Sequence, residues 1–227
     1  CIRAARAKNK EIYFAMPYIL RKEAKNLYDR FFEAFEFDGV LLRNYDSYQF
    51  LMEKAPGVKA VLDCNMYQFN KEAKAFWKER GIAGLTAPVE LNYRELKELG
   101  CEECELIVYG YLQMMVSAQC IRKTVDQCVR EVGFMKMTDR YHKEFVIKSC
   151  CDYCYNVIYN TEALSLIDQR TEITDLSPAA LRLHFTLENA YETKAIMKSF
   201  EDVFVRNRRV DMPEGGFTRG HFRRGIK

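Results

Sequence analysis

The stretch from Lys59 to Asn65 reads KAVLDCN, and it decides the fold of this sequence. Its apolar core is continuous rather than alternating, which is typical of a strand covered on both faces. Helical patterns lie on either side, at residues 47–54 and 71–80, and Gly81 follows the second where a left-handed C-cap is usual. This order predicts a strand of a parallel sheet between two crossover helices.

The same alternation continues in both directions along the chain. Apolar runs occupy residues 12–20, 39–44, 82–91 and 105–109, and helical patterns occupy residues 93–99 and the stretch in which Leu27, Phe31, Phe32 and Phe35 recur. Short apolar runs separated by helices predict an α/β fold with a parallel sheet. No Gly-x-Gly-x-x-Gly follows any of these runs, which favours a partial (β/α) TIM-type barrel over an open doubly wound sheet.

After Gly110 the alternation stops and a cysteine-bearing insertion begins. We predict a hairpin at residues 134–138 and 144–148, then a strand at 156–159, a helix at 161–167, a strand at 181–185 and a helix at 188–204. The chain thus divides into a barrel segment at 1–110, the insertion at 111–160, and a last strand–helix unit with a basic tail at 161–227. Because the chain begins at Cys1 without a methionine, we expect a fragment whose upstream barrel strands are missing.

Composition places the chain among ordinary globular proteins. Of its 227 residues, 48% are hydrophobic and 30% are charged, so it can bury a core. No apolar run reaches the length of a membrane helix and no signal peptide is recognisable, so we expect a cytoplasmic protein without a membrane span. The net charge of +3 is too small to indicate a nucleic-acid partner. The tail, however, concentrates basic residues that could follow a phosphate backbone or form a solvated surface: Arg206, Arg208, Arg209, Arg219, Arg223, Arg224 and Lys227.

The nine cysteines point to a metal or cluster rather than to disulfides, because cytosolic thiols stay reduced and an odd number cannot all pair. The spacing Cys120-x7-Cys128-x22-Cys151-x2-Cys154 gathers four thiolates in one stretch. Such a set binds zinc or holds an iron–sulfur cluster, and spacing does not separate the two. Buried, unligated cysteines are the alternative reading.

Further cysteines leave this assignment open. Cys150 is adjacent to Cys151 and could replace it. The second C-x2-C pair, Cys101 and Cys104, could complete a site with Cys151 and Cys154, although it precedes a strand rather than following one. Cys64 follows the stretch 59–63 and could be a ligand, a thiol facing the pocket, or a core residue.

Two carboxylates are candidates for catalysis. Asp63 and Glu90 both stand near strand ends, where a carboxylate can act as a base or bind substrate, and where it can equally be a cap or an ion-pair partner. No Gly-x-Ser-x-Gly elbow, His-Glu-x-x-His helix or phosphate-binding glycine loop is present. The histidines, His142, His184 and His221, fit structural roles better than catalytic ones.

Several motifs together resemble one family, the collagenase-like peptidases of unassigned catalytic type, family U32. They are Glu105-Leu-Ile-Val-Tyr-Gly110, Met115-Val-Ser-Ala-Gln-Cys120, Asp139-Arg140, Phe145, Cys151-x2-Cys154, Tyr155-Asn156, Tyr159-Asn160, Ala87-Pro-Val-Glu-Leu91, Leu181-Arg182 to Glu188, and Gly220-His221-Phe222-x2-Gly225. The match is specific around the cysteines and looser before them. The resemblance covers most of the chain from Ile12 onward.

The resemblance implies a barrel and a choice of chemistries. Several relatives are similar to oxygen-independent hydroxylation enzymes or their accessory proteins, which hold a four-iron cluster on four cysteines and act on an RNA base or a quinone precursor. On that pattern Cys120, Cys128, Cys151 and Cys154 are cluster ligands, with zinc as the alternative cofactor. Substrate contacts would fall on Arg182, Glu188 and His221.

We therefore expect an iron–sulfur enzyme that hydroxylates an RNA base or a small aromatic molecule with the help of a small-molecule co-substrate. A metal-dependent, collagenase-like peptidase is one alternative, as the family name implies. A zinc-stapled module that binds RNA without catalysis is another. The sequence makes no prediction of the oligomeric state.

Overall fold

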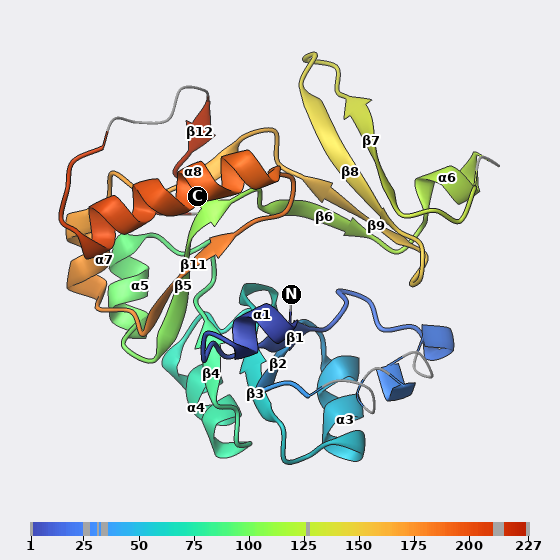
Figure 1. Cartoon of the computed structure of the whole chain (residues 1–227), viewed down its shortest axis with the longest axis horizontal. Helices are drawn as coiled ribbons and strands as arrows, with labels where there is room; N and C mark the ends of the chain where they lie inside the picture. Colours follow the sequence, from blue (N-terminus) through green and yellow to red (C-terminus); the bar gives the residue numbers. More distant parts are fainter. Residues whose placement is uncertain are drawn as a thin grey trace. The chain divides into compact units, whose positions relative to one another are not determined.

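The computed structural model (Figure 1) describes residues 2–24, 28–30, 32, 36–125, 128–210 and 216–225. The described residues form two compact units. The first comprises Cys1–Thr86, Ser117–Val132 and Ser149–Asn156, and the second comprises Ala87–Val116, Gly133–Lys148 and Val157–Lys227. The cysteine-bearing stretch is therefore divided between them, with Cys120, Cys128, Cys151 and Cys154 all in the first unit. The division of the sequence at residues 110 and 160 stays a prediction.

The first unit contains a parallel sheet flanked by helices. Its strands are β1 (Tyr13–Ala15), β2 (Gly39–Leu42), β3 (Lys59–Leu62) and β4 (Gly84–Thr86), paired in this order and all parallel. Its helices are α1 (Ile2–Arg6), α3 (Tyr45–Lys54), α4 (Lys71–Glu79) and the short α6 (Ile121–Thr124), with 3-10 turns at Lys22–Ala24 and Cys64–Met66. The predicted order of strand, helix and strand over residues 39–86 is confirmed.

Local sequence explains these elements. Asn44 and Asn70 begin α3 and α4, since each side chain accepts a hydrogen bond from a backbone N–H of the first turn. Leu42 and Leu62 are fully buried, as expected of strands covered on both faces. The helical pattern at Leu27, Phe31 and Phe35 lies outside the described residues.

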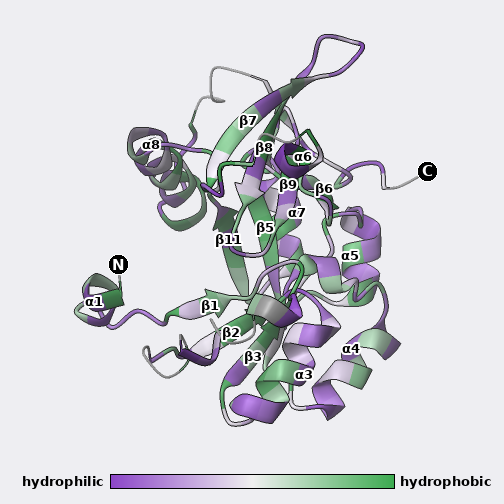
Figure 2. Ribbon diagram, turned by 90° about the vertical axis from the view of Figure 1, so that its right-hand side faces the viewer, coloured by the Kyte–Doolittle hydropathy of each residue, from purple (hydrophilic) through white to green (hydrophobic). Residues whose placement is uncertain are grey.

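The second unit is built around one long strand, β5 (Cys104–Gly110). It pairs in parallel with β11 (Ala180–His184) and antiparallel with β10 (Ala163–Ser165), which pairs in parallel with β12 (Phe217–Thr218). Its helices are α5 (Tyr93–Leu99), α7 (Arg170–Leu176) and α8 (Ala190–Phe200), and α8 continues as a π turn over Glu201–Val205. Figure 2 shows β5 and β11 mostly in hydrophobic green.

A four-stranded sheet accounts for most of the stretch after Gly110. Its order is β6 (Gln113–Ser117), β9 (Tyr155–Tyr159), β8 (Glu144–Cys150) and β7 (Gly133–Thr138). The predicted hairpin is confirmed as β7 and β8, whose turn places His142 in the left-handed region at φ 61°. Strand β6 was not predicted from the sequence.

The helix predicted at residues 161–167 is wrong. Ala163–Ser165 is strand β10, because its backbone pairs with β5 on one side and with β12 on the other. These partners are more than forty residues away on either side, so local periodicity carried no sign of them. Helix α7, which follows β10, was also missed.

The fold class is thus a mixed α/β arrangement with a parallel-rich sheet of alternating strands and helices. Strand β10 is the antiparallel exception to the predicted parallel pairing. Closure into a TIM-type barrel stays a prediction. No helix in the described part of the chain combines the length and apolar character needed to cross a membrane.

Gly110 offers a test of the pairing between β5 and β11. It has a φ of 143°, and a Cβ added there would lie 2.3 Å from the carbonyl oxygen of His184, its partner in the register. We expect Gly110→Ala to destabilise the protein by about 2–4 kcal/mol, because backbone strain and a backbone clash add. Gly57→Ala is the matched control, since a Cβ there meets nothing within 4 Å. Urea unfolding followed by circular dichroism makes the comparison, and equal midpoints for both variants would contradict the pairing.

Candidate functional site

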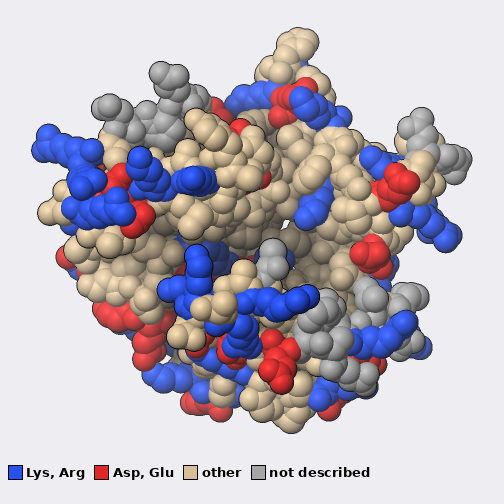
Figure 3. Space-filling view, viewed as in Figure 1, with Lys and Arg blue, Asp and Glu red and all other residues tan. Residues whose placement is uncertain are grey.

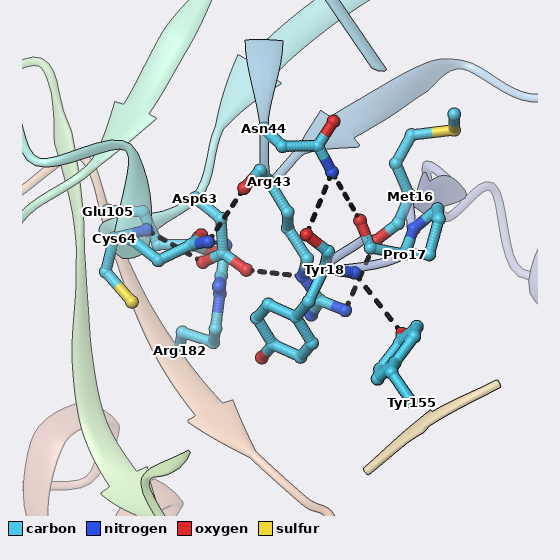
Figure 4. A network of polar contacts seen from close by, with 11 residues as sticks. Met16, Pro17, Tyr18, Arg43, Asn44, Asp63, Cys64, Glu105, Tyr155 and Arg182 are labelled. Carbon is cyan, nitrogen blue, oxygen red and sulfur yellow. Dashed lines mark hydrogen bonds and ion pairs between the residues drawn. The ribbon is translucent and has the colours of Figure 1, made fainter. Parts of the chain in front are cut away.

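A cluster of polar side chains stands at the C-terminal ends of the strands of the first unit (Figure 4). Arg43 follows β2 and Asp63 follows β3, and the Arg43 Nε lies 2.7 Å from the Asp63 Oδ2. The guanidinium carbon of Arg43 lies 4.4 Å from the ring centroid of Tyr18. Asp63 is 1% exposed, and its Oδ1 accepts a hydrogen bond of 2.9 Å from the Cys64 backbone N–H. Asp63 is therefore ion-paired, which is one of the roles considered for it from the sequence. Its role as a catalytic base stays a prediction.

The surrounding loops are tied to this cluster by further hydrogen bonds. The Asn44 side chain donates to the Tyr18 carbonyl at 3.1 Å, and the Asn65 side chain donates to the Arg43 carbonyl at 2.7 Å. The Tyr18 backbone N–H donates to the Tyr155 hydroxyl at 3.3 Å. These bonds fix the loop after β1 above the ends of β2 and β3 within the first unit.

The cluster presents a positive charge beside an aromatic ring. Burial alone would lower the pKa of Arg43, but the facing Tyr18 and Asp63 outweigh it, so the pKa lies above its usual value. For the Tyr155 hydroxyl, burial raises the pKa, and the neighbouring Cys150 raises it further. Arg43 therefore stays cationic and Tyr155 stays neutral, an arrangement suited to a planar or anionic ligand.

The cysteine loops of the first unit enclose a cavity of about 510 Å³. Cys120 and Cys154 both line it, with Arg21 and Lys123 as basic neighbours. Cys120 is buried at the start of α6, whereas Cys154 ends a turn in the left-handed conformation at φ 53°. The structure thus brings two of the four predicted ligands to one cavity.

Arg21 holds these loops in place. Its Nε donates to the Tyr153 carbonyl at 2.9 Å, and its NH2 donates to the Ala118 carbonyl at 2.6 Å and to the Cys154 carbonyl at 3.4 Å. One guanidinium therefore links the segment before Cys120 to the turn that ends at Cys154. Because all three acceptors are backbone carbonyls, the contacts leave the thiols of the cysteines available.

The adjacent Cys150 and Cys151 have different surroundings. The Cys150 thiol makes a side-chain hydrogen bond with the Tyr155 hydroxyl. Burial raises the pKa of Cys151, and the charges of Cys120 and Cys128 raise it further, which places Cys151 within electrostatic range of both. The Cys151 thiol also donates a hydrogen bond of 3.0 Å to the Glu131 carbonyl. Both thiols thus have hydrogen-bond partners, and the assignment of Cys151 as the ligand stays a prediction that its charge interactions with Cys120 and Cys128 support.

The remaining cysteines lie apart from this group. In the second unit, the Cys101 thiol donates to the Leu96 carbonyl at 3.3 Å and the Cys104 thiol to the Gly100 carbonyl at 3.5 Å. Both residues are buried, as expected of small core side chains. Cys64 is also buried, at the start of a 3-10 turn in the first unit.

The placement of the predicted ligands bears on the kind of cofactor. A single zinc would draw its sulfurs to within about 4 Å of one another, given Zn–S bonds of about 2.3 Å. Among the described residues, no group of three His, Cys, Asp or Glu side chains is arranged to hold one metal ion. Cys120, Cys128 and Cys151 nevertheless lie within electrostatic range, and Cys154 lines the same cavity as Cys120. An iron–sulfur cluster, whose ligands bind different irons, and zinc both stay predictions for these cysteines.

Glu90 and His221 lie together in the second unit. Glu90 is half-buried, and its Oε2 is buried without a hydrogen-bond partner. Burial raises the pKa of this carboxyl, and the charge of His221 partly opposes the rise. The Nδ1 of His221 lies 3.1 Å from the Gly225 carbonyl oxygen. The predicted catalytic residues Asp63 and Glu90 thus belong to different units.

The other predicted substrate contacts also lie in the second unit. Arg182 forms an ion pair with Glu105 (Figure 4). The Glu188 Oε2 accepts hydrogen bonds from the backbone N–H groups of Thr186 and Leu187, at 2.7 and 3.0 Å. Glu188 is therefore held firmly at the end of β11, where it lines a separate cavity.

Several arginines of the basic tail have acidic or polar partners. Arg206 pairs with Glu201 at 2.8 Å and with Asp202, Arg208 pairs with Asp202 at 3.4 Å, Arg219 pairs with Asp168, and Arg223 donates to Gln169 at 3.0 Å. Figure 3 shows acidic and basic side chains mixed over α8 and the segment after it. Lys227 lies outside the described residues. Both readings of the basic tail, a solvated surface and a phosphate-binding segment, stay predictions.

Sequence reasoning missed Tyr18, Arg21, Arg43 and Tyr155 as site residues. A signal existed for one of them, because Arg43 directly follows a buried strand, as Asp63 does. The hydrogen bonds between Tyr18 and Tyr155 and between Arg21 and Ala118 join residues about a hundred or more positions apart, and nothing local indicates these contacts.

Comparison with known proteins identifies a family. The model of the family described as Peptidase family U32 matches residues 1–131, which is more than half of the chain. Comparisons with curated proteins and with solved structures gave no match.

The buried carboxyl of Glu90 predicts a pH dependence of stability. Its pKa is raised in the folded protein, so the folded state binds a proton more tightly than the unfolded state does, and stability falls as pH rises from the unfolded pKa through the folded one. We expect Glu90→Gln to remove this fall and to raise the melting temperature at pH 7, while leaving it nearly unchanged at pH 4. Melting curves across this pH range test the assignment. A variant that melts lower than the parent chain at pH 7 would overturn it.

Proposed function

The chain belongs to peptidase family U32, and we propose that it is an iron–sulfur enzyme of that family that hydroxylates an RNA base or a small aromatic molecule. The cluster would be held by Cys120, Cys128, Cys151 and Cys154. One observation carries the proposal, namely that Cys151 lies within electrostatic range of Cys120 and Cys128 while Cys154 and Cys120 line one cavity. Family membership alone does not specify this chemistry.

The residues of the first unit have defined roles in this proposal. When bound, the cluster supplies one-electron transfer, and a small-molecule co-substrate supplies the oxygen atom. Arg21 holds the cysteine loops by their carbonyls, so the thiols are positioned before the cluster binds. Arg43 and Tyr18 offer a charge and a ring to a planar substrate, and Asp63 orients Arg43.

Peptide hydrolysis is the second candidate, and Glu90 is the observation that favours it. A half-buried carboxyl with a raised pKa next to a histidine is the kind of group that serves as a general acid or base. On this reading Glu90→Gln abolishes cleavage of a collagen-derived peptide. On the hydroxylation reading, the protein has no such cleavage activity to lose.

The adjacent cysteines provide the sharpest test of the cluster. We expect the anaerobically purified chain to be brown and to contain about four irons and four sulfides. Cys151→Ala should lose most of the iron, because it removes a ligand, whereas Cys150→Ala should keep it, because that thiol bonds to Tyr155. Iron and sulfide assays with an absorption spectrum give the readout.

Three outcomes of the iron and sulfide assays would contradict the proposal. A colourless, iron-free protein that retains full activity would refute it. If Cys150→Ala loses iron and Cys151→Ala does not, then Cys150 is the ligand and our assignment of Cys151 is wrong. One bound zinc per chain in place of iron would favour a stapled loop over a redox centre.

A further inference from the structure

The second unit contains a cavity that the proposed cluster site does not use. Its volume is about 930 Å³, within the range of small-molecule pockets. Glu162, Glu188 and Glu192 line it together with the rings of Tyr109 and Tyr111. Lys143 and Glu144 also line the cavity, and Glu144 forms an ion pair with Lys136 at 2.6 Å. The walls are thus predominantly acidic and aromatic.

Two buried oxygen atoms of this cavity have no hydrogen-bond partner among the residues that the structure describes. Ser165 is 1% exposed, and its Oγ is unpartnered. The Oε1 of Glu188 is also buried and unpartnered, although its Oε2 is bonded to two backbone N–H groups. A buried polar atom without a partner is costly, so these two oxygens are positioned for a ligand that supplies donors.

Strand pairing brings these two oxygens to the same region. Ser165 of β10 lies directly opposite Tyr109 of β5 in the antiparallel register, so their side chains share one face with Cβ atoms about 5 Å apart. Tyr109 and Glu188 line the same cavity, and the Glu188 carboxylate is near enough to raise the pKa of the Tyr109 hydroxyl. Tyr109 therefore lies between the Ser165 hydroxyl and the Glu188 carboxylate.

Tyr109 and Tyr111 of this cavity stay neutral. Burial raises the pKa of Tyr109, and the charge of Glu188 raises it further. Burial and the charges of Glu188 and Glu192 likewise raise the pKa of Tyr111. The negative charge of the cavity is therefore carried by carboxylates, beside neutral rings whose faces attract cations.

We propose that this cavity binds a small organic molecule through its primary ammonium group, which donates hydrogen bonds to the Glu188 Oε1 and the Ser165 Oγ. A primary ammonium has three N–H donors and no acceptor, which matches two unpartnered oxygens and a ring face. Its alkyl chain would lie against Tyr109 and Tyr111. An anion is disfavoured by the acidic walls, and a neutral alcohol cannot match the charge of Glu188.

The test is calorimetric titration of the full chain with pentylamine, which is protonated at pH 7. Pentan-1-ol serves as a neutral probe of equal length, and pentanoate as an anionic one. We expect pentylamine to bind at least ten times more tightly than either. Glu188→Gln should weaken the binding at least tenfold, and Glu102→Gln, an exposed position of the same unit outside the cavity, should leave it unchanged.

Ser165→Ala separates a ligand-binding role from a structural one. Because the Oγ has no partner in the protein, its removal should leave the melting temperature unchanged or raise it, while pentylamine binding weakens. A melting temperature that falls in Ser165→Ala, with binding unaffected, would overturn the assignment. So would an equal affinity for pentylamine and pentan-1-ol, or full binding by Glu188→Gln. Cys151→Ala should bind pentylamine normally, so the result does not depend on the cluster.

Discussion

The ion pair between Arg43 and Asp63 sets the geometry of the first unit's functional end. Both charges are largely buried, and a buried charge is stable only when it is paired and hydrogen-bonded. Asp63 satisfies this with the Arg43 side chain and the Cys64 N–H, and Arg43 adds the face of Tyr18. The ends of β2 and β3 must therefore stay in register with the loop that follows β1. Removing either charge would leave the other unpaired in a site with little water.

The same loop carries this constraint to the cysteines. The backbone N–H of Tyr18 donates a hydrogen bond to the Tyr155 hydroxyl. Three residues further along the loop, the Arg21 side chain donates hydrogen bonds to the carbonyls of Ala118, Tyr153 and Cys154. The ends of β2 and β3 thus hold the loop after β1 in place. This loop in turn holds the two segments that carry the predicted ligands Cys120 and Cys154. Sites built in this way hold their donors more precisely than free loops do.

What the sequence could predict follows from the range of the interactions. Strands β2, β3 and β5 could be predicted because burial on both faces gives continuous apolar runs. Strand β10 could not be predicted in this way, because it forms by pairing with β5 and β12, which are distant in the sequence. The sequence also could not show which of Cys150 and Cys151 is the ligand. It depends on β8 reaching Cys150, after which successive side chains face opposite sides.

The charges around the cysteines bear on what the site can hold. Four thiolates brought together repel one another, and burial makes the repulsion stronger. Lys123 and Arg21 line the cavity beside Cys120 and Cys154, and the charge of Arg122 favours the thiolate of Cys151. Asp152 also lines this cavity, so its walls combine thiols, cations and one carboxylate. Of the two carboxylates predicted to act in catalysis, Asp63 belongs to the first unit with the cysteines and Glu90 belongs to the second.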